Sequence, residues 1–190
     1  MLLSTESGGT PSNYYRDEFR IFEKYVFLDW AVVSPLPARA ANAVKELLDS
    51  LTYFTEENAS AQHVKLDSLA ISLKQEAAKL LNASEDEIAI TGTSTSQGVQ
   101  IALESIRPQK GENIVTTDLE FPLAGVEAQK WRERGAEIRV WRHKNGTYSL
   151  DDLANLVDKN TKVILLSSVT WVNGYKFDLE EVSKIAHEVG

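Results

Sequence analysis

The N-terminal part of the chain places hydrophobic residues at helical spacing. Apolar side chains recur at intervals of three and four over residues 36–51, after a Ser-Pro pair at 34–35 that is typical of a helix start. A second such pattern covers residues 66–81. We predict two amphipathic helices, joined by a polar connection at 55–63 that is a candidate boundary. A short apolar run at 25–29 (YVFLD) predicts a strand before the first helix.

From about residue 87 the pattern alternates between strand-like and helix-like segments. The predicted strands are residues 88–91, 113–117, 137–141 and 162–169, and the predicted helices are 99–106, 123–134, a short one capped by Ser149 with Asp152, and a last one capped by Asp178 with Glu181. The run KVILLSSV is the longest apolar strand, as expected for a strand covered on both faces. This order predicts βα units, an α/β fold and a largely parallel sheet.

The composition narrows the function without identifying it. Hydrophobic residues make up 43% and charged residues 25% of the 190, which excludes disordered and collagen-like chains. Twenty basic and 28 acidic side chains give a net charge of −8, which disfavours general binding to nucleic acid or to anionic membranes. The chain has no cysteine, and this excludes disulfides, thiolate catalysis by this chain and cysteine-based metal sites.

No apolar run approaches the roughly 20 residues that cross a bilayer. Residues 1–20 lack the basic start and apolar stretch of a secretory signal, so we interpret them as a polar arm. We therefore expect a cytoplasmic protein with no membrane and no nucleic acid as partner. His63, His143 and His187 are not spaced as metal ligands, and no metal site is predicted.

Three polar or aromatic segments follow predicted strands, where open α/β sheets bind their ligands. Residues 91–98 (TGTSTSQG) offer hydroxyls and N–H groups for an anion, or they only cap the following helix. Residues 118–122 (DLEFP) place Phe121 either on a flat cofactor or in the core. Residues 167–175 (SSVTWVNGY) form either an aromatic and hydrogen-bonding wall of the same pocket or a locally packed turn.

Four segments, in this order and spacing, resemble the class V aminotransferases. They are YVFLDWAVVSPLP, TSTSQGVQ, TDLEFPLAGVEAQKW and SSVTWVNGYKFDLEEVSKIAHEVG. This family of pyridoxal-phosphate enzymes includes cysteine desulfurases, selenocysteine lyases, kynureninases and isopenicillin-N-epimerase-like proteins. The resemblance covers nearly the whole chain from Tyr25. It implies the large domain of a fold type I transferase, which is a three-layer α/β/α structure with a mostly parallel sheet, incomplete in this chain.

The resemblance also implies a cofactor and the residues that bind it. The cofactor would be pyridoxal 5'-phosphate, and the small-molecule substrate would be an amino acid. Ser94, Thr95 and Ser96 would bind the cofactor phosphate through hydroxyls and backbone amides. Phe121 would stack on the pyridine ring, in a position that is often His in desulfurases.

The chain departs from a typical desulfurase at the third segment. Trp171 stands where desulfurases carry an Asn beside the phenolic oxygen of the cofactor, so that hydrogen bond is lost or is replaced through Asn173. Gln97 and Gln100 replace the usual Glu and Asn of the phosphate loop. Desulfurases of this family also use a cysteine to accept sulfur, and the chain has none.

The resemblance implies that the rest of the active site comes from elsewhere. In the family, the lysine that holds the cofactor, the Asp on its ring nitrogen and an arginine for the substrate carboxylate all follow the part matched here, so the catalytic residues stay unassigned. We expect the N-terminal half of a homodimeric family member. Its expected parts are the arm at 1–20, a segment at 21–60 that contributes to the small domain and the site entry, and the first half of the cofactor-binding large domain at 61–190.

The sequence thus predicts a pyridoxal-phosphate-dependent enzyme that acts on an amino acid by transamination, elimination, desulfuration or racemisation. One alternative is a truncated or split fragment without catalysis, which acts as a scaffold or with a partner chain. A more distant alternative is a nucleotide-binding α/β domain that uses the same Ser/Thr loop. The absence of a Gly-rich fingerprint counts against it.

Overall fold

The computed structural model describes residues 16–31, 33–92 and 94–190. The chain divides into two compact units, one ending at Ala89 and the other beginning at Ile90, and each is described separately. The division predicted at residue 60 falls in the first turn of a helix and stays a prediction about domain roles. Among the described residues, no helix combines the length and apolar character that a membrane span needs.

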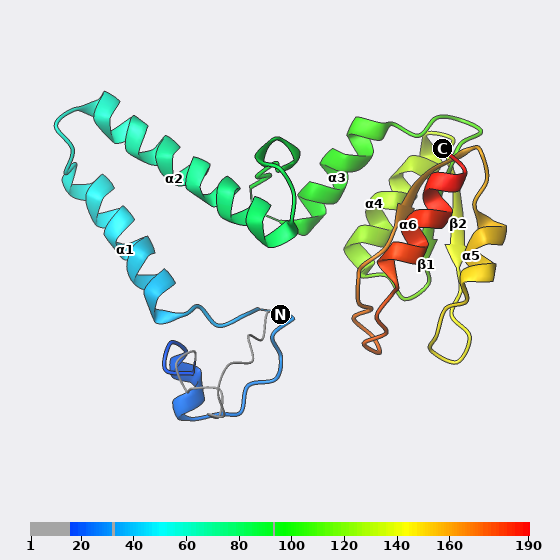
Figure 1. Ribbon diagram of the computed structural model, residues 1–190, viewed down its shortest axis with the longest axis horizontal. Coiled ribbons are helices and arrows are strands. Elements are labelled where there is room, and N and C mark those ends of the chain that lie inside the picture. Colours follow the sequence, from blue (N-terminus) through cyan, green and yellow to red (C-terminus); the bar gives the residue numbers. More distant parts are fainter. Residues whose placement is uncertain (1–15, 32, 93) are drawn as a thin grey trace. The chain divides into compact units, whose positions relative to one another are not determined.

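The first unit consists of helices and their connections (Figure 1). Its elements are the short 3-10 helices η2 (Arg20–Glu23) and η3 (Glu85–Glu87) and the α-helices α1 (Ala38–Tyr53) and α2 (Ala59–Leu81). Both predicted helices are confirmed, but their starts differ from the prediction. Helix α1 begins after Pro37 and not at Ser34, because a residue that precedes a proline, here Leu36, is disfavoured in the helical conformation.

Helix α2, in contrast, starts earlier than its hydrophobic pattern indicates. Asn58 is its N-cap, and the Asn58 side chain accepts a hydrogen bond from the Ala61 N–H at 3.0 Å. The predicted polar connection therefore supplies the first turn of the helix. Residues 25–29 and 88–91 form no strand in the described structure, so the two strands predicted there are wrong. Apolar character alone does not make a strand when no partner accepts its backbone hydrogen bonds.

The second unit alternates helices and strands as predicted. Its elements are α3 (Thr95–Ile106), β1 (Asn113–Thr117), α4 (Pro122–Glu133), β2 (Glu137–Trp141), α5 (Leu150–Leu156), β3 (Thr161–Leu165) and α6 (Leu179–Glu188). The strands form one parallel sheet in the order β2-β1-β3. The predicted bounds of β1 and β2 are confirmed to the residue. The α/β class and the parallel sheet are confirmed as well.

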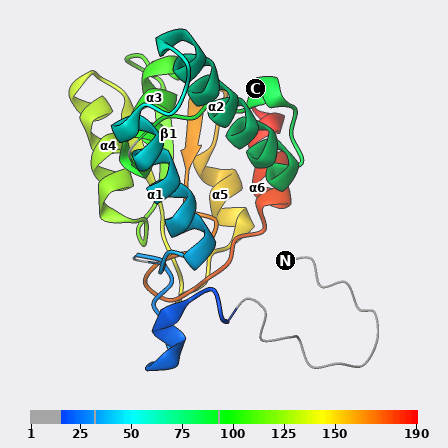
Figure 2. The ribbon, with the colours of Figure 1, turned by 90° about the vertical axis from the view of Figure 1, so that its left-hand side faces the viewer.

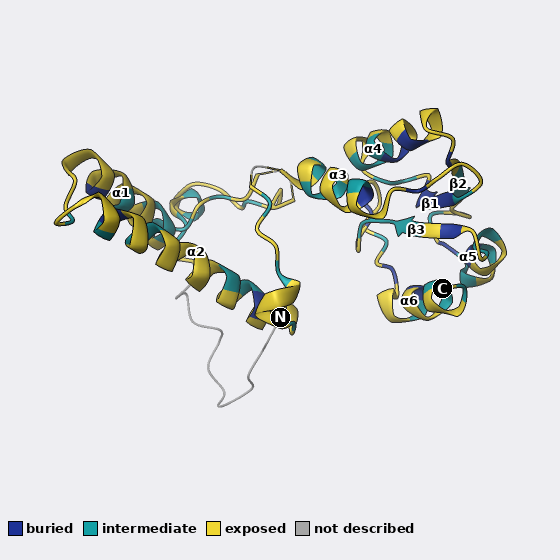
Figure 3. Cartoon of the chain, turned by 90° about the horizontal axis from the view of Figure 1, so that it is seen from above, coloured by how far each residue is buried: buried dark blue, intermediate teal, exposed yellow. Residues whose placement is uncertain are grey.

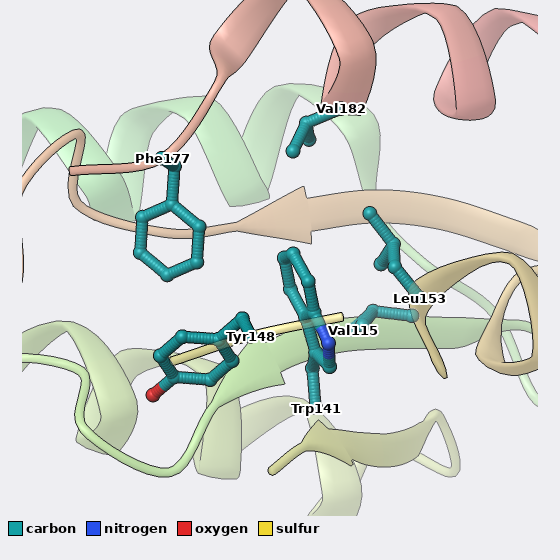
Figure 4. Close-up of a cluster of buried hydrophobic side chains, with 6 residues drawn as sticks. All are labelled: Val115, Trp141, Tyr148, Leu153, Phe177 and Val182. Carbon is teal, nitrogen blue, oxygen red and sulfur yellow. The ribbon is translucent and has the colours of Figure 1, made fainter. Parts of the chain in front are cut away.

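Helices cover both faces of this sheet (Figures 2 and 3). The central strand shows this with two adjacent residues, because successive side chains of a strand point to opposite faces. Ile114 packs with Leu103 of α3 and with Trp131 of α4. Val115 lies in a second cluster with side chains from α5, β2 and α6, among them Leu153, Trp141 and Val182 (Figure 4). All five residues of β1 are buried, and the three-layer α/β/α architecture is confirmed.

Two local predictions in this unit need correction and one is confirmed. Strand β3 ends at Leu165 and does not continue to Val169, because the N–H of Ser167 donates to a carboxylate and not to a neighbouring strand. Ser149 precedes α5, but its side chain makes no capping hydrogen bond. Asp178 caps α6 as predicted, and its carboxylate accepts from the Glu181 N–H at 3.2 Å.

The amino ends of the strands are joined by a polar network. The Thr161 hydroxyl donates to Asn113 Oδ1 at 2.8 Å, and Asn113 Nδ2 donates to Asp158 Oδ1 at 3.2 Å. Arg139 also donates to the Asp158 carboxylate at 2.8 Å, and this guanidinium holds the pKa of Asp158 below its ordinary value. A hydrogen-bond network thus occupies the amino ends of the strands, whereas open α/β sheets bind ligands at the opposite, carboxyl ends.

Candidate functional site

The loops that follow the three strands lie together at one end of the second unit (Figure 1, lower end). They are residues 118–121 after β1, 142–149 after β2 and 166–178 after β3. The first turn of α3 faces the same end, because α3 precedes β1 and runs antiparallel to it (Figure 1). This is the edge at which open α/β sheets bind ligands.

The amino end of α3 has the groups of an anion site. Ser94 is the N-cap, and its Oγ accepts from the Gln97 N–H at 3.2 Å. The N–H groups of Thr95 and Ser96 open the helix, where the backbone geometry leaves such donors without an intrahelical acceptor. Within the described part of the chain, the hydroxyls of Thr95 and Ser96 form no hydrogen bond. Two hydroxyls and two amides at the positive end of the helix dipole can bind a phosphate.

Glu120 connects the loop after β1 with the end of β3. Its Oε2 accepts from the Ser167 N–H at 2.7 Å. Its Oε1 accepts from the Ser167 hydroxyl at 2.5 Å and from the N–H of Phe121 at 2.8 Å. One carboxylate therefore binds donors from two loops that lie far apart in the sequence.

The side chains of Phe121 and Trp171 are in contact next to Glu120. Their ring centroids are 5.8 Å apart and the rings meet edge to face at 81°. The Trp171 indole Nε1–H donates to the carbonyl oxygen of Glu120 at 3.3 Å. Phe121 is 47% and Trp171 60% exposed, so both rings offer apolar surface to a planar ligand.

Asp118 connects the loop after β1 with the loop after β2. Its Oδ1 accepts from the Tyr148 hydroxyl at 2.9 Å and from the His143 N–H at 3.1 Å. The Tyr148 hydroxyl points away from the buried cluster that surrounds the rest of the ring (Figure 4). Burial, together with the hydrogen bond to Asp118, raises the pKa of Tyr148 to about 12.

Asn173 makes the third connection, between the loops after β3 and β2. Its Oδ1 accepts from the Thr170 hydroxyl and from the Tyr175 N–H, and its Nδ2 donates to the carbonyl of Gly146 at 2.8 Å. Each pair of the three loops is therefore joined by at least one polar side chain. The side-chain oxygen of Asn173 has both of its acceptor positions occupied, and one amide hydrogen remains for a ligand.

The structure brings two of the six residues predicted for the site, Phe121 and Trp171, into contact. The third aromatic-loop candidate, Asn173, lies in the same loop as Trp171, but its side chain bonds to Thr170, Tyr175 and Gly146. Ser94, Thr95 and Ser96 lie at the same end of the unit and are not hydrogen-bonded to those three in the described part of the chain. Among the described residues, no group of three or more His, Asp or Glu side chains could hold a metal ion.

Sequence reasoning assigned no role to Asp118, Glu120 or Tyr148. Asp118 and Glu120 directly follow a fully buried strand, at the edge where ligands bind, and this position was a usable signal. Tyr148 had no such signal, because its role depends on an acceptor in a distant segment.

Comparison with known proteins now places the chain among relatives. A probable cysteine desulfurase of Methanothermobacter thermautotrophicus is 26% identical over 176 residues, which are 92% of this chain and 44% of the relative. A kynureninase of Shouchella clausii is 24% identical over 185 residues, 94% of this chain and 43% of the relative. A solved structure of C-DES, with glycine covalently linked to its PLP cofactor, superposes with a TM-score of 0.82 at 22% identity and covers 94% of this chain and 46% of that one.

The chain thus spans less than half the length of each of these relatives. The structural likeness supports the fold described above. The sequence model of the aminotransferase class-V family matches residues 26–190, which is most of the chain. The chain therefore belongs to the class-V aminotransferase family.

Proposed function

We propose that this chain carries the phosphate-binding and ring-stacking half of the site of a pyridoxal-phosphate-dependent enzyme that acts on an amino acid. Membership of the class-V aminotransferase family over residues 26–190 is the observation that carries the proposal. The C-DES protein, which shares this fold, binds pyridoxal phosphate. The donors at the start of α3 and the exposed ring of Phe121 match the two ends of such a molecule.

The residues present fit this cofactor. A phosphate is satisfied by the N–H and hydroxyl groups of Thr95 and Ser96, while Ser94 keeps the helix start in place through its bond to the Gln97 N–H. A pyridine ring is planar and apolar on its faces, and Phe121 offers a ring of the same kind.

The remaining two residues act around the ring. The indole N–H of Trp171 already donates to Glu120, so Trp171 contributes ring surface and not a hydrogen bond. Asn173 contributes its one remaining amide hydrogen. When bound, pyridoxal phosphate supplies an electron sink for negative charge on the substrate carbon. This chain has no cysteine, so we propose no step in which its own thiol accepts sulfur.

The same proposal includes a homodimer, a cytoplasmic location and the division into an arm at 1–20, a site-entry segment at 21–60 and a cofactor-binding part from 61. The homodimer and the roles of the parts at 21–60 and from 61 rest on the resemblance to the family. The location and the arm rest on the sequence pattern, which has no membrane-length apolar run and a polar start. Sedimentation velocity of the gene-encoded protein tests the homodimer, and a monomer at micromolar concentration would contradict it.

The phosphate site is tested with the double variant Thr95→Ala/Ser96→Ala of the gene-encoded protein. Losing two hydroxyl donors to a charged group should weaken binding by about a hundredfold or more, at about 1.5–3 kcal/mol for each such bond. The dissociation constant of pyridoxal phosphate is measured by absorbance titration. Ser105→Ala is the matched control, because the Ser105 hydroxyl donates to Ile101 near the far end of the same helix.

The outcomes of this titration separate the site from the function. If the double variant loses affinity for pyridoxal phosphate and Ser105→Ala keeps it, the result supports the phosphate site at Thr95 and Ser96. Equal affinity in both variants contradicts the role of Thr95 and Ser96. A wild-type protein that binds no stoichiometric pyridoxal phosphate contradicts the function and favours the scaffold alternative.

A further inference from the structure

We propose that Glu120 is a positioning residue that holds the Phe121–Trp171 ring pair in the orientation that receives the cofactor ring. The ligand named here rests on the proposed function above, whereas the positioning itself rests on contacts within this chain. Glu120 lies in the loop after β1 and is half-buried. Its carboxylate contacts the backbone of Phe121, and its main-chain carbonyl contacts the indole of Trp171.

The carboxylate holds the loop itself. It accepts three hydrogen bonds, from the Phe121 N–H at 2.8 Å, from the Ser167 N–H at 2.7 Å and from the Ser167 hydroxyl at 2.5 Å. Such distances are typical of charge-assisted hydrogen bonds, which are the stronger class. The backbone of Phe121 is thereby connected to Ser167, two residues after the last residue of β3.

The main chain of Glu120 holds the second ring. Its carbonyl oxygen accepts from the Trp171 Nε1–H at 3.3 Å, and the indole meets Phe121 edge to face. Trp171 is 60% exposed and belongs to neither buried cluster of the described structure. We infer that the indole is oriented by its hydrogen bond to the Glu120 carbonyl and by its contact with the ring of Phe121. Glu120 takes part in the first directly and in the second by holding the Phe121 backbone.

Three donors require an acceptor that has no hydrogen of its own. An ionised carboxylate accepts on both oxygens, whereas a carboxamide of the same shape has one oxygen and one NH2 group. In Glu120→Gln the NH2 group must face either the Ser167 N–H or the Phe121 N–H, and at least one bond is replaced by a contact between two donors. Among the described residues, Glu120 forms no ion pair with a basic side chain. The hydrogen bonds of its carboxylate oxygens are those from Phe121 and Ser167.

The side chains of Glu120, of Ser167 and of the ring pair lie outside the two buried clusters, although the neighbouring residues Leu119 and Leu166 pack against the first one. Changes at Glu120 are therefore expected to move the rings while the core stays folded. A purely structural role would instead affect the core and the rings together.

The test labels the gene-encoded protein with 5-fluorotryptophan and records ¹⁹F NMR spectra of wild type, Glu120→Gln, Ser167→Ala and the control Glu133→Gln. The chain has four tryptophans, and Trp171→Phe assigns the resonance of Trp171 by its loss. Trp131 and Trp141 are buried on the two sides of the sheet, so their resonances report on the fold. Glu133 is an exposed carboxylate at the end of α4.

We expect the Trp171 resonance to shift or broaden in Glu120→Gln and less so in Ser167→Ala, which keeps the Ser167 N–H. The resonances of Trp131 and Trp141 should stay in place, and Glu133→Gln should match wild type. The affinity for pyridoxal phosphate should fall about tenfold in Glu120→Gln and about threefold in Ser167→Ala, in line with the loss of one charge-assisted bond or one hydroxyl bond.

A Trp171 resonance that is unchanged in Glu120→Gln overturns the proposal. If Glu120→Gln fails to fold, Ser167→Ala decides, and an unchanged Trp171 resonance there overturns it as well. A wild-type protein without affinity for pyridoxal phosphate overturns the proposed function, while a shifted Trp171 resonance still supports the positioning by Glu120.

Discussion

The indole of Trp171 meets the ring of Phe121 edge to face, with 5.8 Å between the ring centroids, although the two residues follow different strands. Both rings stay largely exposed at the carboxyl edge of the sheet. Aromatic pairs with this geometry are favoured because the positive edge of one ring faces the negative face of the other. The pair therefore forms an apolar surface before any ligand binds.

Phe121→Ala tests the use of this surface. The variant removes the ring that would stack on the pyridine, and aromatic pairs contribute about 0.5–1.5 kcal/mol, so the dissociation constant of pyridoxal phosphate should rise up to about tenfold. Absorbance titration measures it, and visible circular dichroism of the bound cofactor reports its orientation. Leu123→Ala, an exposed apolar residue two positions further on, is the control. Full affinity in Phe121→Ala would exclude the stacking role.

Burial of Tyr148, together with its hydrogen bond to Asp118, makes the free energy of unfolding depend on pH in the alkaline range. The pKa of Tyr148 is raised from 10.0 to about 12, so the folded protein holds this proton more tightly than the unfolded chain. The stabilisation is complete below pH 10 and is lost as the pH rises from about 10 to 12. Urea unfolding of wild type should therefore show a fall in the free energy of unfolding across this window.

Tyr148→Phe removes the contribution of the Tyr148 proton to the pH dependence of the free energy of unfolding. At pH 8 the variant should be less stable by about 1.5–3 kcal/mol, because one hydrogen bond to a charged acceptor is lost. Between pH 10 and 12 its stability should fall less steeply than that of wild type. Tyr53→Phe, at a side chain that is 75% exposed, is the control and should keep the wild-type slope. Equal slopes for Tyr148→Phe and wild type would show that the Tyr148 proton is not the cause.

Gly146 and Gly174 form a matched pair that isolates the contribution of Asn173. Both have positive φ angles, +85° and +70°, so alanine is strained at either position by about 1–2 kcal/mol. A Cβ atom at Gly146 would come within 3.0 Å of Asn173 Nδ2, whereas a Cβ at Gly174 would meet nothing within 4 Å. Gly146→Ala should therefore lose more stability and should also disturb the bond from Asn173 to the Gly146 carbonyl.

Hydrogen exchange measures both effects of these alanine variants. Gly146→Ala should speed exchange in the loop at 169–176, and Gly174→Ala should do so less. Similar exchange and similar stability in both variants would mean that the Asn173 amide moves aside without cost.

Much of the second unit was predictable from local patterns. The bounds of β1 and β2 follow from short apolar runs between polar turns, and the cap of α6 follows from Asp178 with a partner three positions away. The wrong predictions share a cause. Residues 25–29 and 88–91 have strand-like composition, but the described structure offers them no neighbouring strand. The start of α2 was missed because a single cap, Asn58, outweighs the hydrophobic pattern that begins later.

The site shows the same division between local and distant interactions. The Ser/Thr start of α3 and the aromatic character of residue 121 are visible in the sequence, since each depends on residues within a few positions. The contacts of Glu120 with Ser167, of Asp118 with Tyr148 and of Asn173 with Gly146 are not visible there. They join loops that meet only after β2, β1 and β3 have paired side by side, and hydrogen bonds between distant segments form only when tertiary folding has brought donor and acceptor within about 3 Å.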